Sequence, residues 1–305
     1  MSAWALASLL AKLVLILGLL ASAGGIAALR DYHDGSRAGH LRLLSFSLAG
    51  AVAGFHFSLL PVLLQVGQIN DSGFMGMFDL NLLWLLRGTP VWESAAFRGT
   101  GFFLAILLTL SLLRALRQQK SAPPPAYYRI AWLGQLLALG LVAYGFTLIG
   151  HISVLEWLPR SALLLHVSAV AVWFGMLLPL RWCCDGPSVS GLQAQMQRFS
   201  RLGICLVIAL IASGVTLLLS LIPLSELLTT SYGRILTVKL GLVVLLVALA
   251  SLNKWRHTPR LQQVGGALAL RSSIDREIAL GMALIVVSAV VSTLLGPAQH
   301  SAMAM

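Results

Sequence analysis

The sequence predicts an all-α membrane protein, a polytopic bundle of eight transmembrane helices. Of its 305 residues, 58% are apolar and only 10% are charged. Soluble domains average about 25% charged residues, so this composition excludes an ordinary soluble enzyme and a disordered chain. The apolar residues gather in eight stretches, each near the roughly 20 residues that a membrane-spanning helix needs. The stretches are about 4–29, 43–66, 96–113, 131–150, 161–180, 202–222, 235–252 and 278–296.

The first stretch, 4–29, resembles a signal peptide in its Lys12 and in the small residues at its end. Its apolar part is longer than the roughly 7–15 residues of a signal-peptide core, so we expect a retained span. No long polar region separates the stretches, and we expect no soluble domain. We divide the chain into an N-terminal membrane half, 1–130, and a C-terminal membrane half, 131–305.

The basic residues predict one orientation in the membrane. The first, third, fifth and seventh connections between the stretches hold 15 of the 21 Lys and Arg residues. Cytoplasmic connections are the ones enriched in Lys and Arg, so these four should face the cytoplasm. Both termini should then face outward, to the periplasm of a bacterial inner membrane. The net charge of +11 therefore reflects topology and contact with anionic lipid head groups in the bilayer, and we expect no nucleic-acid partner.

The three cysteines, Cys183, Cys184 and Cys205, lie in an expected span or a cytoplasmic connection. A structural disulfide is therefore not expected. The adjacent Cys183 and Cys184 allow two interpretations, a soft-metal site of two thiolates or a pair of reduced thiols. We favour the reduced pair.

Two other connections have features of their own. The largest outward loop, 67–95, predicts a short interfacial helix flanked by Trp84 and Trp92. In the last connection, Ser272 or Ser273 is placed to cap the final helix.

Short matches between the two halves favour an internal repeat. Thr89 precedes Arg98 at the start of the third stretch, and Thr230 precedes Lys239 at the same spacing in the seventh. Four spans in each half would make the repeat parallel. Chance likeness between apolar helices is the alternative interpretation. Further matches pair Arg30 with Arg181, Asp34 with Asp185, and Gly150 with Gly296.

Three histidines lie at similar depth in the outward half of the membrane. They are His56 in the second stretch, His151 at the end of the fourth and His166 in the fifth. Ionisable groups within a span are costly, and they usually face the bundle interior or a water-filled cavity. Neutral imidazole is a common metal ligand, so the three could converge on one ion. The alternative is that each binds a neighbouring hydroxyl or carbonyl group.

Further soft ligands lie on the outward side. Met75 and Met77 lie in the largest outward loop, and the C-terminal tail carries His300, Met303 and Met305. Thioethers and imidazoles suit Cu(I), which makes these residues candidate metal ligands. Packing is the alternative for the loop methionines, and an uninvolved chain end is the alternative for the tail.

Two cations, Arg98 and Lys239, lie a few residues inside the outward start of a span. Each could extend to the membrane surface, pair with a nearby carboxylate such as Glu93 or Glu226, or hold an anion. The sequence leaves these three interpretations open.

The segments GHISVLEWL and LLLHVSAVAVWFGML, followed by LLTTSYGRILTVKLGL and LRSSIDREIALGM, resemble the copper resistance protein D (CopD) family. The resemblance covers about 150–297 and is weak in the first half. It implies an eight-helix inner-membrane protein that carries copper inward or supplies it to copper enzymes, with a periplasmic copper-binding partner, CopC. Family members often carry an acidic residue shortly before the histidine of the fifth span, where this chain has Leu163 and Leu164. The matching positions are His151, His166, Trp173, Gly175, Tyr232, Gly233, Lys239 and Glu277.

These observations predict a non-enzymatic membrane protein that transports or delivers copper, as Cu(I) or Cu(II), through outward-facing histidines and methionines. The sequence has no P-loop motif, and no nucleophile–base pair or paired carboxylates at a common depth. We therefore expect neither ATP coupling nor catalysis. One alternative is an electron carrier that binds haem b between histidines of neighbouring helices. The other is an assembly scaffold without bound metal.

Cysteine labelling tests the predicted orientation. In a variant without Cys183, Cys184 and Cys205, a single cysteine at Ser72 should react in intact cells with a maleimide that cannot cross the inner membrane. A single cysteine at Ser121 should react only after the cells are opened, because the third connection should face the cytoplasm. The reverse pattern would contradict the orientation.

Overall fold

The structure, a computed structural model, describes residues 2–31, 37–118, 125–186 and 189–294. Within these ranges every regular element is a helix, which confirms the predicted all-α polytopic bundle. The long helices are α1 (Ala3–Asp31), α2 (Arg37–Asn70), α4 (Pro90–Gln118), α5 (Pro125–Thr147), α6 (Trp157–Gly175), α8 (Val189–Leu221), α9 (Ser231–Leu252) and α10 (Gly266–Leu294). The short ones are η1 (Phe74–Phe78), α3 (Leu80–Leu85), η2 (His151–Val154), α7 (Leu177–Cys183), η3 (Leu224–Glu226), η4 (Asn253–His257) and η5 (Thr258–Arg260).

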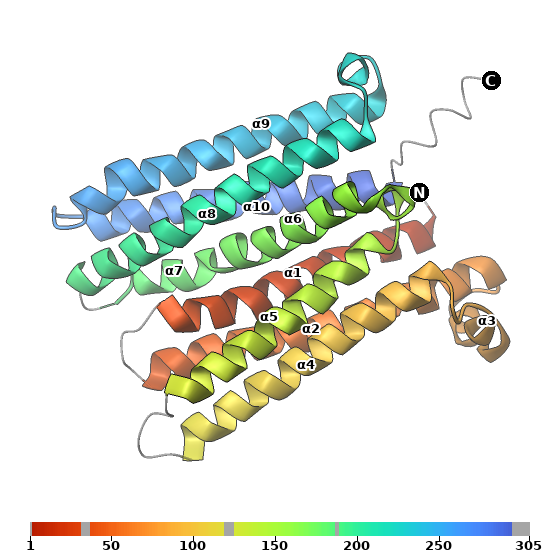
Figure 1. Cartoon of the computed structure of the whole chain (residues 1–305), viewed down its shortest axis with the longest axis horizontal. Coiled ribbons are helices and arrows are strands. Elements are labelled where there is room, and N and C mark those ends of the chain that lie inside the picture. Colours follow the sequence, from red (N-terminus) through yellow and green to blue (C-terminus); the bar gives the residue numbers. More distant parts are fainter. Residues whose placement is uncertain (1, 32–36, 119–124, 187–188, 295–305) are drawn as a thin grey trace.

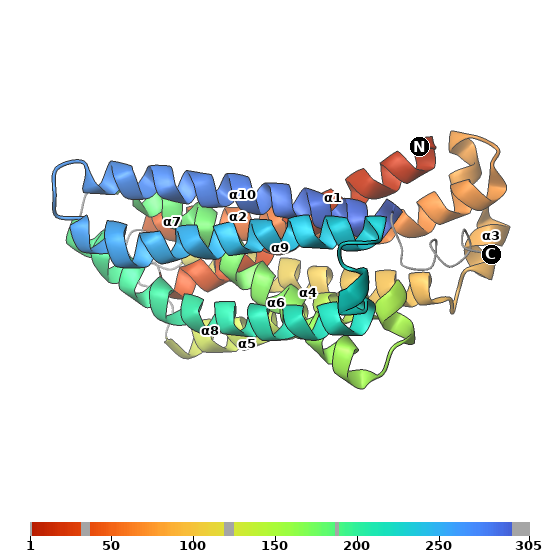
Figure 2. The same ribbon diagram turned by 90° about the horizontal axis from the view of Figure 1, so that it is seen from above.

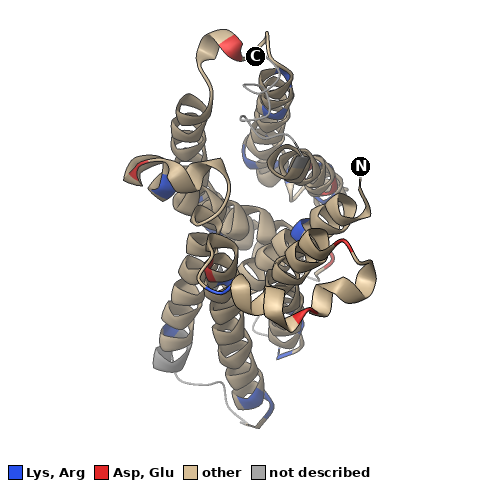
Figure 3. Cartoon of the chain, turned by 90° about the vertical axis from the view of Figure 1, so that its right-hand side faces the viewer, with Lys and Arg blue, Asp and Glu red and all other residues tan. Residues whose placement is uncertain are grey.

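The long helices lie side by side and alternate in direction along the chain (Figure 1). α1 begins and α10 ends at the same end of the bundle as the short helix α3, and we call this the α3 end. The opposite end, near α7, is called the α7 end (Figure 2). In a view onto the α3 end, charged residues occupy only short parts of the ribbons, most of which are tan (Figure 3). This is expected for helices that lipid surrounds.

Seven helices in the described residues are long and apolar enough to cross a membrane. They are α1, α2, α4, α5, α6 continued by α7, α8, and α9 continued by η4 and η5. The eighth expected span, 278–296, falls in α10, which is not among the seven. α10 carries four ionisable residues between Arg271 and Glu277, so its apolar part begins only at Ile278. Up to Leu294, the last described residue, this part has 17 residues, which is the short end of the range for a span. Seven of the eight expected spans are thus supported, and the eighth stays a prediction.

The loop 67–95, which we expect to face outward, contains the expected short helix, α3. The carboxylate of Asp79 accepts hydrogen bonds from the backbone N–H groups of Asn81 (2.9 Å) and Leu82 (3.2 Å). This cap satisfies two of the N–H groups that the first turn of a helix leaves without partners. Trp84 lies within α3 rather than beside it, and its side chain is largely exposed.

α1 lies at the centre of the bundle, where it contacts α2, α5, α6, α7, α8 and α10. Glycines let it approach its neighbours closely. A Cβ atom on Gly18 would lie 2.7 Å from the backbone nitrogen of Gly54 in α2, and a Cβ atom on Gly24 would overlap the backbone of Gly175 in α6. Small residues at helix contacts are a common means of packing in lipid, where the hydrophobic effect does not bring helices together.

α6 and α7 form one apolar stretch with a break at Met176. Pro179 has no N–H group, so it cannot donate the helical hydrogen bond to the carbonyl of Gly175, four residues before it. The helix thus breaks next to Gly175. This glycine is also the residue at which α6 crosses α1, in contact with Gly24.

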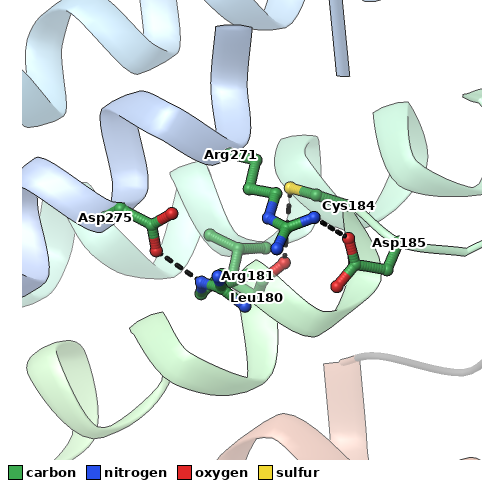
Figure 4. A network of polar contacts seen from close by, with 6 residues as sticks. All are labelled: Leu180, Arg181, Cys184, Asp185, Arg271 and Asp275. Carbon is green, nitrogen blue, oxygen red and sulfur yellow. Dashed lines mark hydrogen bonds and ion pairs between the residues drawn. The ribbon is translucent and has the colours of Figure 1, made fainter. Parts of the chain in front are cut away.

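Ion pairs at the α7 end join the end of α7 and the residues after it to α10 (Figure 4). Arg181 pairs with Asp275, and Arg271 pairs with Asp185 at 2.6 Å. All four side chains are partly exposed. We therefore expect these pairs to orient the helix ends more than to stabilise the fold.

The final helix begins earlier than the sequence predicted. α10 starts at Gly266, so Ser272 and Ser273 lie inside it and the expectation that one of them caps the helix is wrong. The residue before the helix, Gly265, has a φ of 77°, which glycine adopts without the strain that a side chain would bring. The chain can therefore turn sharply and enter the helix at once.

Replacing Gly24 or Gly175 by alanine should destabilise the protein by about 1–3 kcal/mol, because overpacking a close contact costs about that much. Gly140→Ala is the control, since nothing lies within 4 Å of a Cβ atom at that position. Thermal unfolding of the detergent-purified variants, followed by tryptophan fluorescence, measures the difference. Equal melting temperatures for Gly24→Ala and Gly140→Ala would contradict the packing described above.

Candidate functional site

His166 is the predicted ligand whose ring faces a neighbouring helix of the bundle. It lies on α6 and is half-buried, and its Nδ1 atom is 3.1 Å from the hydroxyl oxygen of Ser213 on α8. Ser213 is buried. A Cβ atom on Gly214 would lie 3.6 Å from Cε1 of the ring, so the ring packs directly over this glycine. α6 and α8 thus hold the imidazole between them.

The hydrogen bonds of Ser213 indicate which nitrogen of His166 carries the proton. The single hydroxyl hydrogen of Ser213 is shared between two backbone carbonyls, that of Ala209 at 2.6 Å and that of Leu210 at 3.2 Å. The Ser213 oxygen is therefore an acceptor towards His166, and Nδ1 of His166 is the donor. Neutral His166 then has its lone pair on Nε2, which is the atom that can bind a metal ion.

Lys239 on α9 is close enough to His166 to act on it electrostatically. His166 lies nine residues after the start of α6, and Lys239 lies eight residues after the start of α9. At 1.5 Å per residue, both are about 12–14 Å from the starts of their helices at the α3 end. A charged Lys239 would repel a cation at His166.

The other two predicted histidines do not meet His166. His56 is exposed on α2, and its Nδ1 donates to the carbonyl of Val52 in the same helix at 2.8 Å. It lies only two residues after Gly54, which packs against α1, so the two face different sides of the helix. His151 is exposed at the start of η2.

The expected convergence of three histidines on one ion is therefore not found in the described residues. In the described part of the chain, no three side chains of His, Cys, Asp or Glu come together to hold a metal ion. The packing of α2 turns His56 outward, while the packing of α6 turns His166 towards α8. The role of each histidine as a single ligand stays a prediction.

The two loop methionines differ in their surroundings. Met77 is 5% exposed and packs with Ala11 and Leu64, which favours its interpretation as a packing residue. Met75 is 76% exposed, so its thioether is open to an incoming ion. The three tail candidates, His300, Met303 and Met305, lie outside the described residues.

A cavity of about 210 Å³ lies between α1, α4, α5, α6 and α8. Its lining is almost entirely apolar and includes no histidine, methionine or cysteine. The amide of Gln135, at its wall, donates to the carbonyl of Ala105 (3.2 Å) and the hydroxyl of Thr109 (3.0 Å). This cavity therefore offers no soft ligand for copper.

Ser213 and Asn253 are buried polar residues that the sequence did not single out. Each of them contacts a residue that it did single out. Ser213 holds His166, and Asn253 donates to Oε1 of Glu277 at 2.7 Å, with both members of this second pair buried. A hydroxyl in an apolar span is a signal that the sequence does carry, because such groups often bond across helices. Asn253 begins the π-helical turn η4, a feature that the residue pattern does not reveal.

The adjacent cysteines behave as thiols. Cys183 donates to the carbonyl of Pro179 at 3.4 Å, and Cys184 donates to the carbonyl of Leu180 at 3.7 Å. Burial, with the neighbouring charge of Asp185, raises the pKa of the Cys184 thiol to about 11. Because the thiolate is the metal-binding form, this favours a reduced pair over a metal site.

Comparison with known proteins adds an independent line of evidence. Residues 193–291 match the family model described as Copper resistance protein D. The chain is 28% identical to the inner membrane protein YebZ of Escherichia coli (strain K12) over 207 residues, 65% of each chain. It is 26% identical to the copper transport protein CutJ of Bacillus subtilis (strain 168) over 264 residues, 82% of this chain and 46% of CutJ. No solved structure matches the chain significantly.

The apolar helices and these matches define a multi-pass inner-membrane protein. The segment from α8 into α10 is the part that resembles the CopD family. The chain spans less than two thirds of the length of the curated relatives that it matches.

The protonated state of Cys184 can be tested by alkylation. In the double variant Cys183→Ser, Cys205→Ser, the rate of reaction with iodoacetamide should keep rising up to about pH 11, because only the thiolate reacts. Mass spectrometry of samples quenched at a series of pH values measures the rate. The same variant unfolded in denaturant should level off near the ordinary thiol pKa of about 8.5. A folded profile that levels off at the same pH would contradict the burial of this thiol.

Proposed function

We propose that this protein transports or delivers copper at the inner membrane, and that it contributes to copper resistance or homeostasis without catalysing a reaction. The observation that carries the proposal is the match of residues 193–291 to the copper resistance protein D family. The name of the relative CutJ, a copper transport protein, supports transport. The hydrogen bonds around Ser213 support a ligand role, because they favour the proton on Nδ1 of His166 and the lone pair on Nε2.

Copper would enter from the α3 end, which we propose faces the periplasm. His56, His151 and Met75 are exposed ligands of the imidazole and thioether type, to which we add His300, Met303 and Met305 of the tail. Ligands of similar softness can pass Cu(I) from one to the next without releasing it as a free ion. His166 is then the ligand within the bundle that receives the ion.

A periplasmic copper-binding protein of the CopC kind is the proposed donor. The loop at the α3 end offers exposed apolar side chains beside Met75, among them Phe74 and Trp84, at 67% and 70% exposure. Exposed apolar groups of this size often mark contact sites for a partner or the membrane surface. This loop is therefore the surface on which we expect copper to be handed over.

Neither alternative function gains support from the described residues or from the comparisons. A haem b carrier needs axial ligands such as histidines that face one another from neighbouring helices, whereas the side chain that His166 contacts on α8 is that of Ser213. The comparisons name no scaffold, and the hydrogen bond between His166 and Ser213 joins α6 to α8 with or without a metal ion, so it does not separate the two functions.

Copper accumulation in cells tests the proposal. Deletion of the gene should lower cell copper, and His166→Ala should lower it as far. Ser213→Ala should weaken copper binding by the purified protein about 10–100-fold, since loss of the group that orients a histidine ligand costs about that much. His40→Ala, at the α7 end, is the matched histidine control and should leave both quantities unchanged.

Two results would contradict the proposal. Unchanged cell copper after deletion of the gene would remove the transport role. Unchanged copper binding in His166→Ala, at equal amounts of folded protein, would remove His166 as a ligand. A copper-free purified protein with a strong haem absorption band would instead support the electron carrier.

A further inference from the structure

Arg98 is a buried cation without an ionic partner in the described residues. It lies on α4 and is only 3% exposed, so its guanidinium group does not extend to the membrane surface. Its Nε atom donates to the carbonyl of Ser94 at 3.1 Å, whereas Nη2 is buried and has no hydrogen-bond partner. The ion pairs found in the described residues lie at the α7 end, and Glu93 is exposed and not among them.

Lys12 on α1 adds a second positive charge in the same region. The charges of Arg98 and Lys12 are close enough to repel one another, and Lys12 itself is half-buried. The ammonium group of Lys12 has one long hydrogen bond, of 3.4 Å, to the carbonyl of Ser292 in α10. Lys12 is nine residues into α1 and Arg98 is eight residues into α4, which places both about 12–14 Å from the starts of their helices.

Two cations at one depth within a bundle raise each other's energy. Charges in a low-dielectric region are costly unless an opposite charge and hydrogen bonds satisfy them, and like charges repel more strongly there than in water. Arginine stays charged in proteins, so loss of a proton does not relieve Arg98. An anion beside the free Nη2 group would satisfy its N–H donors and reduce the repulsion at the same time.

The space around the guanidinium group limits the size of such an anion. A Cβ atom on Gly145 of α5 would lie 2.5 Å from Cγ of Arg98, and the ring of Phe146 lies 5.2 Å from its Cζ. α5 therefore closes over the arginine, and the Nε atom is already engaged by Ser94. One N–H₂ group and one ammonium group suit a small spherical ion better than a phosphate, which offers several oxygens to a whole guanidinium fork.

We propose that Lys12 and Arg98 bind a small monovalent anion of the size of chloride between α1 and α4. This site is separate from His166, and it does not depend on the copper function proposed above. The anion accepts hydrogen bonds from Nη2 of Arg98 and from the ammonium group of Lys12. It thereby links the central helix α1 to α4, two helices that otherwise meet mainly through α2 and α5.

Thermal unfolding of the delipidated protein in an uncharged detergent tests this site. Sodium gluconate, whose anion is too bulky for the space, is replaced stepwise by sodium chloride at constant ionic strength. The melting temperature should rise with chloride and continue to rise with the logarithm of its concentration above the dissociation constant. Bromide should act like chloride, and phosphate should act less.

Variants separate the site from general salt effects. Arg98→Gln and Lys12→Met should each abolish the chloride-dependent rise, and Arg87→Gln should keep it. Arg87 is the matched control because its guanidinium group is exposed at the α3 end, 4.7 Å above the ring of Trp84. If Arg98→Gln fails to fold, Lys12→Met and the broadening of the chloride-35 NMR line by the unaltered protein still decide the question.

Three outcomes would overturn the proposal. One is an equal melting temperature of the unaltered protein in gluconate and chloride, with no broadening of the chloride line. Another is an equal chloride effect in the unaltered protein and in both Arg98→Gln and Lys12→Met. The third is stabilisation by added phosphatidylglycerol or by phosphate but not by chloride, which would identify a lipid head group or a free oxyanion as the ligand.

Discussion

The close approach of helix backbones at glycines is the constraint on which the rest of this bundle depends. In lipid, burial of apolar surface does not drive helices together, so association relies on packing and hydrogen bonds. The contact of Gly24 with Gly175 places α6 directly on α1. α6 carries His166 and α1 carries Lys12, so both polar sites take their positions from this crossing.

The two halves place related polar residues at the same points of their helices. Lys12 and His166 each lie nine residues after the start of the first long helix of their half, α1 or α6. Arg98 and Lys239 each lie eight residues after the start of the next-but-one long helix. This agreement supports the parallel repeat as a proposal. The contact of Gly24 with Gly175 does not follow the same register, because the two glycines lie 21 and 18 residues after the starts of α1 and α6. We propose an anion between the two cations of the first half and a metal ion at the imidazole of the second half.

Much of the fold could be predicted from the sequence, because length and apolar composition decide which segments enter a membrane. The prediction was weakest where charged residues lie inside a helix, as between Arg271 and Glu277. The sequence places this segment at the start of the last helix, whereas α10 begins earlier, at Gly266. The sequence also did not show which histidine faces inward. The rotation of a span about its axis depends on helix contacts such as that of Gly54, and an evenly apolar sequence carries little trace of it. Ser213 was missed for the same reason, since its position opposite His166 depends on how α6 and α8 pack.

The central claim is that a copper ion binds Nε2 of His166 while Ser213 holds the other ring nitrogen. X-ray absorption spectroscopy of the purified protein loaded with Cu(I) tests it most directly, because the scattering pattern of an imidazole ligand can be recognised. We predict an imidazole contribution that is lost in His166→Ala and retained in His40→Ala. The same imidazole contribution in His166→Ala, or no copper bound to the unaltered protein, would contradict the claim.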